Sequence, residues 1–177
     1  MRQIVLLRGI NIGPRNRLAM PALREALADA GFGGVRTYVQ SGNVVLDSKA
    51  KPDKLAKTCE RLIADTFDLD IAVVVRTRDE LAEVVERNPL GDVADDPKRY
   101  QVTFLSEALD DDAVSGLADL AADDERLAAI GREVYAWHPG GAARSKLWAK
   151  LAGKGLGVTA TARNWTTVTT LLGMADE

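Results

Sequence analysis

Residues 4–13 read IVLLRGINIG: a short apolar run of strand length that passes directly into a polar, glycine-bearing loop. Residues 35–40, VRTYVQ, repeat this arrangement, since they alternate as a strand and continue into Ser41-Gly42-Asn43. Between the two runs, Pro21 and a 3.6-residue apolar spacing predict a crossover helix. A crossover of this kind makes the two strands parallel. We therefore expect the two polar loops to meet at one edge of a sheet.

The rest of the first half completes a regular order of elements. Residues 43–47 return as a strand, Pro52 opens a second helix, and residues 71–75 form a β-branched, apolar run typical of a buried strand. A capping-box pattern at residues 77–80 predicts one more helix. The resulting βαββαβ order is the ferredoxin-like pattern.

The second half follows a similar order after a linker rich in Pro, Gly and Asp over residues 89–97. We expect a strand at 100–105, a helix, a hairpin of strands at 127–130 and 133–138, and a helix over 144–152. Asn164 is expected to cap a last helix, which takes the place of a closing strand. The predicted fold is α+β. It has two ferredoxin-like halves, 1–88 and 98–177, and mostly antiparallel sheets with helices on one face.

Composition indicates a globular protein with an aliphatic core. Hydrophobic residues make up 46% of the 177 and aromatic residues 5%, so aliphatic side chains must fill most of the interior. The single cysteine excludes an intrachain disulfide. No run reaches the roughly 18 apolar residues of a membrane span, and no secretory leader precedes the first strand. We expect a cytoplasmic protein that does not bind membranes.

Charge is distributed unevenly along the chain. Residues 1–40 carry six Arg, no Lys and two acids, whereas residues 90–130 carry eleven acids and three bases. Residues 131–175 carry six bases and one acid. The basic segments could attract an anion, and the acidic segment would repel a long polyanion. Solvated surface charge is the alternative explanation.

Four blocks of sequence resemble one known family. They are LLRGINIG at 6–13, YVQSGNV at 38–44, RSKL at 144–147 and RNWTTV at 163–168. In this order they are similar to the bacterial domain of unknown function 1697 family, over essentially the whole chain. The resemblance implies an α+β fold of two ferredoxin-like halves and no established activity.

The candidate site consists of amide, hydroxyl and cationic side chains. The two loops and the positions that match the family signature supply Arg8, Asn11, Asn16, Gln40, Ser41, Asn43, Lys146, Arg163 and Asn164. These groups offer hydrogen bonds and positive charge but no nucleophile–base pair. We predict that they bind an anionic or phosphorylated small molecule. Loop and helix capping is the structural alternative for the Asn and Ser side chains.

Other chemistries find little support in the sequence. His138, the only histidine, excludes a histidine metal cluster, and its place beside Pro139 predicts a surface residue. Cys59 has the helical spacing of a core thiol. The expected central strands lack the aromatic side chains on which an RNA-binding sheet stacks bases, so nucleic acid is disfavoured. The sequence assigns no reaction and no cofactor.

Two alternatives to small-molecule binding stay open. An exposed sheet edge could make the chain a non-catalytic interaction module that pairs with a protein partner or with itself as a homodimer. Weak association of the basic segments with nucleic-acid phosphates is the other.

Overall fold

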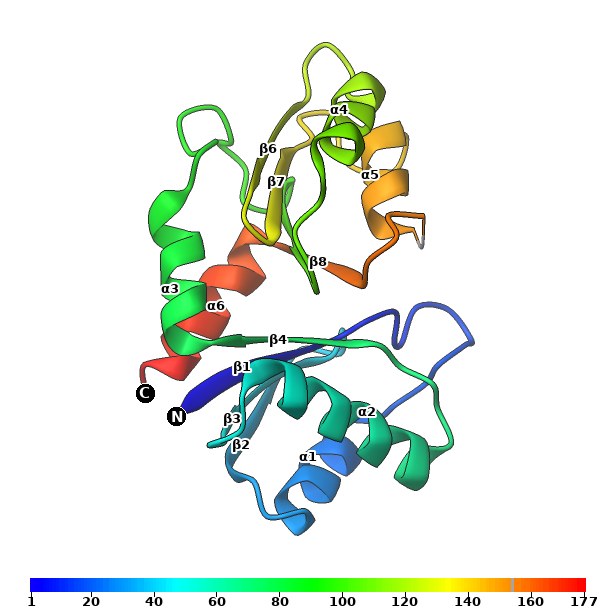
Figure 1. The fold of residues 1–177 in the computed structure, drawn as a ribbon, viewed down its shortest axis with the longest axis vertical. Coiled ribbons are helices and arrows are strands. Elements are labelled where there is room, and N and C mark those ends of the chain that lie inside the picture. The colour runs from blue at the N-terminus through cyan, green and yellow to red at the C-terminus, as the bar shows by residue number, and fades with distance from the viewer. Residues whose placement is uncertain (154) are drawn as a thin grey trace. The chain divides into compact units, whose positions relative to one another are not determined.

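The computed structural model describes residues 1–153 and 155–177, which divide into two compact units (Figure 1). The first unit comprises Met1–Glu83 together with Leu171–Glu177, and the second comprises Val84–Thr170. Each unit contains its own sheet and its own cluster of buried apolar side chains. The two units are described separately below.

The first unit is an antiparallel sheet with two helices packed on one face. Its elements are β1 (Arg2–Leu7), α1 (Met20–Asp29), β2 (Gly33–Tyr38), β3 (Asn43–Asp47), α2 (Pro52–Phe67) and β4 (Val73–Thr77). The strand order is β2-β3-β1-β4, so β1 lies between β3 and β4. Alternate residues of the strands, among them Val5, Leu7 and Val44, form one core with Leu23 of α1 and Leu55 of α2. Pro21 and Pro52 stand at the first helical turns, as predicted.

Helix α3 (Arg78–Arg87) follows β4 and contains the point at which the chain passes from the first unit to the second. Its start confirms the predicted capping box. The Thr77 amide donates to the Glu80 carboxylate over 2.8 Å, and the Glu80 amide donates to the Thr77 hydroxyl over 3.1 Å. Two amides at the helix start are therefore satisfied reciprocally.

The second unit repeats the order of the first and adds a helix. Its elements are β5 (Tyr100–Leu105), α4 (Asp111–Leu120), β6 (Arg126–Ile130), β7 (Glu133–Trp137), α5 (Lys146–Ala152), β8 (Ala160–Asn164) and the first part of α6 (Trp165–Ala175), a helix whose residues from Leu171 onward belong to the first unit. The antiparallel sheet has the order β6-β7-β5-β8. Leu117 of α4 and Leu147 of α5 pack with Val134 and Ala136 of β7 on one face.

Strand β8 corrects the expectation that no closing strand follows α5. The segment ATARN lacks the large β-branched residues that usually mark a strand. Five pairs with β5, from Gln101↔Asn164 to Leu105↔Ala160, hold it in the sheet. Tertiary pairing has therefore outweighed weak local propensity.

The described residues form a mixed α+β structure with two four-stranded antiparallel sheets and six helices. The predicted division into 1–88 and 98–177 with a linker at 89–97 stays a prediction. No helix among the described residues is long and apolar enough to cross a membrane.

Arginines of the first unit hold the C-terminal segment. Arg78 pairs with Asp176 over 2.6 Å, and Arg36 pairs with Glu177. Arg2 pairs with Asp47 over 2.8 Å and also donates to the Met174 carbonyl over 3.5 Å. These contacts explain why Leu171–Glu177 belongs with the first unit although it is the end of the chain.

Gly42 sets how closely the β2–β3 turn approaches β1. The Leu7 amide donates to the Gly42 carbonyl over 2.8 Å. A Cβ added at Gly42 would lie 2.6 Å from the Cβ of Leu7 and 3.0 Å from Cδ1 of Ile10, and its φ is +87°. Both the backbone angle and the packing therefore require glycine here.

We expect Gly42→Ala to lower the free energy of unfolding by about 2–4 kcal/mol, because strain and overpacking add. Gly13→Ala is the matched control, since Gly13 also has a positive φ but open space around the added Cβ. It should cost only about 1 kcal/mol. Urea unfolding of both variants measures the difference, and equal losses would show that the contact with β1 contributes nothing.

Candidate functional site

The two polar loops of the first unit meet, as the sequence predicted. The side-chain amide of Asn11 donates to the carbonyl of Gln40 over 2.8 Å. Residue Leu6 at the end of β1 pairs with Asn43 at the start of β3. Strands β1 and β2 are both antiparallel to β3, so their C-terminal ends lie at the same edge of the sheet.

The side-chain amides of the three predicted asparagines form hydrogen bonds within this part of the first unit. Besides its bond to Gln40, Asn11 donates to the Leu18 carbonyl and accepts from the Leu18 amide, each over 2.8 Å. Asn43 is buried and donates to the Ser41 hydroxyl over 2.9 Å and to the Tyr38 carbonyl over 3.1 Å. Asn16 donates to the Gly9 carbonyl over 3.4 Å. The structural alternative therefore accounts for these three amides.

The other predicted residues of the loops lie at the surface. Gln40 and Ser41 are exposed, and Arg8 is half-buried with its backbone amide on the Ala72 carbonyl at 2.9 Å. The exposed Arg17 donates to the carbonyls of Asn11 and Gly13 over 3.4 and 3.2 Å. Cationic and amide groups are thus gathered at this end of the sheet.

Two apolar side chains stand exposed beside the bond between the loops. Ile12, next to Asn11, is 75% exposed, and Val39, next to Gln40, is 52% exposed. Val39 has a φ of +50°. A β-branched residue in the left-handed region is an outlier that costs energy, and such outliers cluster at functional sites. No pattern in the sequence predicts this backbone strain.

The remaining predicted residues belong to the second unit and fall into two groups. Arg163 and Asn164 have structural contacts. Arg163 is 7% exposed and donates to the Thr161 hydroxyl over 2.6 Å and to the Ala162 carbonyl over 2.8 Å, and burial lowers its pKa to about 10. Asn164 accepts from the Thr167 amide over 2.9 Å and so caps α6, as expected. Lys146, in contrast, is exposed at the start of α5.

Lys146 lines a cavity of about 460 Å³ in the second unit. One wall is the end of α4 and the turn that follows it, and the other is the loop after β7 with the start of α5. The lining residues are Asp119, Leu120, Ala121, Ala122, Asp124, Glu125, Gly140, Gly141, Arg144, Ser145 and Lys146.

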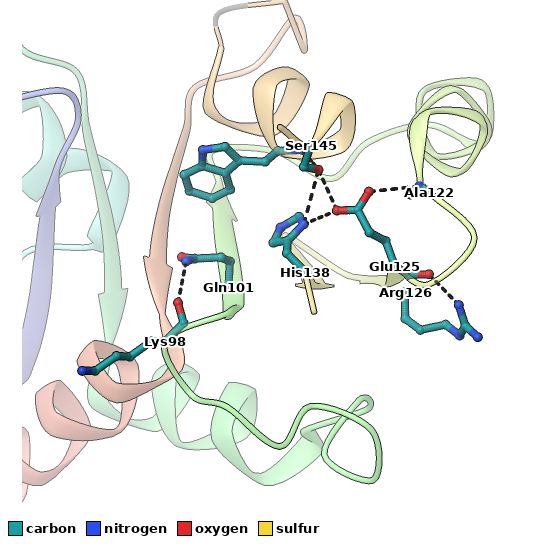
Figure 2. A network of polar contacts seen from close by, with 8 residues as sticks. Lys98, Gln101, Ala122, Glu125, Arg126, His138 and Ser145 are labelled. Atoms are coloured by element: carbon teal, nitrogen blue, oxygen red, sulfur yellow. Dashed lines mark hydrogen bonds and ion pairs between the residues drawn. The ribbon is translucent and has the colours of Figure 1, made fainter. Parts of the chain in front are cut away.

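A buried carboxylate, Glu125, joins these two walls (Figure 2). Its Oε1 accepts from the Ala122 amide over 3.0 Å. Its Oε2 accepts from the Ser145 hydroxyl over 2.6 Å and contacts Nδ1 of His138. Burial alone would raise the pKa of this carboxyl, but the hydrogen bonds from Ala122, Ser145 and His138 outweigh burial and lower it. Glu125 is therefore an ionised group in the cavity wall.

His138 is fully buried, which corrects the prediction of a surface residue. It continues the alternation of Val134 and Ala136, whose side chains face α4 and α5, and its amide bonds to the Arg99 carbonyl over 3.0 Å. Trp148 of α5 packs edge-on against its ring, with centroids 5.9 Å apart. The neighbouring Pro139 predicts a strand end at the surface. The alternation of inward-facing side chains at every second residue predicts burial instead, and His138 is buried.

The arrangement of Ser145, His138 and Glu125 differs from the catalytic triad of a serine hydrolase. Nδ1 of His138 faces the Glu125 carboxylate, so we assign the ring proton to this nitrogen. Ser145 directs its proton to the same carboxylate, lies 3.4 Å from Nδ1, and accepts from the Trp148 amide over 3.0 Å. In a triad the histidine takes the serine proton. Here the carboxylate is the closer base, and the serine is a helix cap.

The remaining acids and the single cysteine of the described residues are the candidates for a metal site and for a reactive thiol. Among the described residues, no group of three or more His, Cys, Asp or Glu side chains could hold a metal ion. Cys59 is buried in the first core, and burial raises its pKa to about 12, so the thiol stays protonated. The expectation of a core thiol is confirmed.

We expect Glu125→Gln to lower the free energy of unfolding near neutral pH by about 2 kcal/mol, because charge-assisted hydrogen bonds are lost. The folded pKa of Glu125 lies below the ordinary 4.5, so its contribution is complete above that pH and is lost as the pH falls through the folded pKa. The gap between wild type and variant should therefore shrink in acid. Urea unfolding over a pH series measures it.

Asp123→Asn is the matched control, because Asp123 is an exposed acid outside the cavity lining. This variant should unfold like the wild type near neutral pH. A gap for Glu125→Gln that stays constant or widens in acid would contradict an ionised Glu125.

Comparison with solved structures identifies the same fold elsewhere. The conserved bacterial protein SP0830 from Streptococcus pneumoniae superposes with a TM-score of 0.79. The match covers 98% of each chain at 24% sequence identity, so the likeness concerns the fold. Among curated proteins, none matches this chain.

The predicted family is confirmed by a family model described as "Protein of unknown function (DUF1697)", which matches residues 1–135 of the chain. This range holds the first unit's loops, all of β1 to β7 except the last two residues of β7, and Glu125. The chain belongs to the DUF1697 family of proteins of unknown function.

Proposed function

We propose that this protein binds a small polar molecule in the cavity of the second unit. The observation that carries the proposal is a cavity of about 460 Å³ with a buried, hydrogen-bonded carboxylate, Glu125, in its wall. Small-molecule pockets range over about 300–1,000 Å³ and fix their ligands with a few placed polar groups. A carboxylate of shifted pKa at a concave surface is a further mark of such sites.

Two cations at this cavity offer a site for an anionic or phosphorylated group of the ligand, and three carboxylates line the same cavity. Lys146, one of the predicted site residues, and Arg144 both line it. Binding of an anion at the first unit's loops stays a prediction. Its support is the gathering of Arg8, Arg17 and Gln40 at one sheet edge, while the asparagine amides there are engaged with backbone.

A second candidate function, association with a protein partner or a second copy, rests on a different observation. Ile12 and Val39 are exposed apolar side chains on two loops that a hydrogen bond joins, and Val39 keeps an unfavourable backbone conformation. Neither feature stabilises the isolated chain. Both are expected if these side chains contact a partner.

We also infer that each unit is ferredoxin-like. The support is the order strand, helix, two strands, helix, strand in both, with the first and third strands adjacent at the centre of each sheet.

A substitution that fills the cavity tests the main proposal. Gly140 lines the cavity, its φ is not positive, and an added Cβ meets open space, so Gly140→Leu should fold. We expect small polar fragments to shift amide resonances of Gly141, Ser145 and Ala122 in the wild type. In Gly140→Leu the same fragments should leave those amides unshifted.

Gly116→Leu in α4 is the matched control, because Gly116 also has room for a side chain but lies outside the lining. It should respond to the fragments like the wild type. Fragment-induced shifts that persist in Gly140→Leu, or that never occur at these amides, would contradict binding in this cavity.

The second candidate is tested by Val39→Asn. Asn tolerates the left-handed region, so we expect the variant to gain about 1 kcal/mol of stability in urea unfolding. If the loops join two copies, sedimentation should show an association of the wild type that the variant loses. A wild type that stays monomeric at all concentrations would exclude self-association through this surface.

A further inference from the structure

The two walls of the cavity carry opposite charge. Asp119, Asp124 and Glu125 lie on the wall formed by the end of α4 and the turn after it. Arg144 and Lys146 lie on the wall formed by the loop before α5 and its first residue. Gly140 and Gly141 border the second wall without adding side-chain bulk. The charges are therefore sorted by wall rather than interspersed.

The opposite charges border the same cavity from its two walls. The bond from Ser145 to Glu125 links the walls, Asp124 precedes Glu125, and Arg144 and Lys146 flank Ser145 in sequence. Even so, neither these cations nor the two aspartates take part in an ion pair within the described residues. The cavity keeps the two signs apart.

Glu125 is not the group that meets a ligand cation. Its two oxygens accept from Ala122 and Ser145 and contact His138, all within the unit. Asp119 and Asp124 are exposed at the same wall and have no hydrogen bond to their side chains among the described residues. The aspartates are thus placed to receive a cation, and Glu125 holds the walls in position.

We propose that the ligand of this cavity is a zwitterion, a small molecule with an ammonium group at one end and a carboxylate or phosphate at the other. The inference rests on the proposed function and names its ligand class. A purely anionic ligand would meet the acidic wall, and a purely cationic one the basic wall, whereas a zwitterion satisfies both. Its ammonium would face Asp119 and Asp124, and its anionic end Arg144 and Lys146.

Matched probes separate the two charges. γ-Aminobutyrate carries both groups, butylamine only the cation, and butyrate only the anion. Phosphoethanolamine, ethanolamine and inorganic phosphate repeat the comparison with a phosphate, which distinguishes the two kinds of anion. Titrations followed by the amide resonances of Gly141, Ser145 and Ala122 give the dissociation constants. We expect one zwitterion to bind at least about tenfold more tightly than both of its single-charge analogues.

Two variants assign the charges to the walls. Lys146→Ala should weaken binding of the zwitterion and leave butylamine or ethanolamine unchanged. Asp124→Asn should weaken the zwitterion and leave butyrate or inorganic phosphate unchanged. Both side chains are exposed and make no hydrogen bond to any residue whose position the structure describes, so both variants are expected to fold.

The outcomes separate this inference from the proposed function. Single-charge probes that bind as tightly as the zwitterions would overturn the ligand class while leaving a binding cavity. The ligand class would also be overturned, and the binding cavity kept, if other fragments shift the cavity amides and no zwitterion does. If neither fragments nor probes shift these amides, both the ligand class and the proposed function fall.

Discussion

A carboxylate that is taken out of water must be hydrogen-bonded, and Glu125 meets this requirement by joining three separate pieces of the second unit. The Ala122 amide comes from the turn after α4, His138 from the end of β7, and Ser145 from the start of α5. These pieces are the walls of the cavity or lie directly beside them. One buried charge thus fixes the position of the surfaces that a ligand would contact. The serine, while donating to the carboxylate, also caps the helix that presents Lys146.

In the first unit, uncharged residues position two loops, as the charged Glu125 positions the cavity walls in the second unit. Asn11 ties the first loop to Gln40 and Leu18, and Gly42 lets the second loop approach β1 closely. The side-chain amide nitrogen and oxygen of Asn11 form hydrogen bonds with backbone atoms of the loops. What they leave at the surface is a pair of apolar side chains, Ile12 and Val39, and several cationic or amide groups. Partner binding at this end of the sheet is accordingly the second function that we propose.

Much of this architecture could be predicted from local pattern. Prolines mark the starts of α1 and α2, and a capping box marks the start of α3. A crossover helix between two strands predicts that the two loops meet, and the bond from Asn11 to Gln40 joins them. The cavity could not be predicted in the same way. Residues 123–126 read DDER, which is typical of solvated surface, and only the fold shows that the third of these charges is buried. Two weaker signals were present: the alternation that turns His138 inward, and the spacing from Ser145 to Trp148 of a helix cap. Lys146 is predicted as a site residue because it matches the family signature, and it lines the cavity. Arg163 and Asn164 match the same signature, but their hydrogen bonds stabilise β8 and the start of α6.

An ionised Glu125, held by three donors, keeps the cavity walls in place. A pH titration of the side-chain carboxyl carbons by NMR, in protein labelled at glutamate and with the Glu125→Gln variant to assign the resonance, measures its protonation. We expect the Glu125 carboxyl to titrate below the ordinary value of 4.5. A midpoint above that value would mean that burial keeps the carboxyl neutral. It would contradict an ionised Glu125 at the centre of the hydrogen bonds that position the cavity walls.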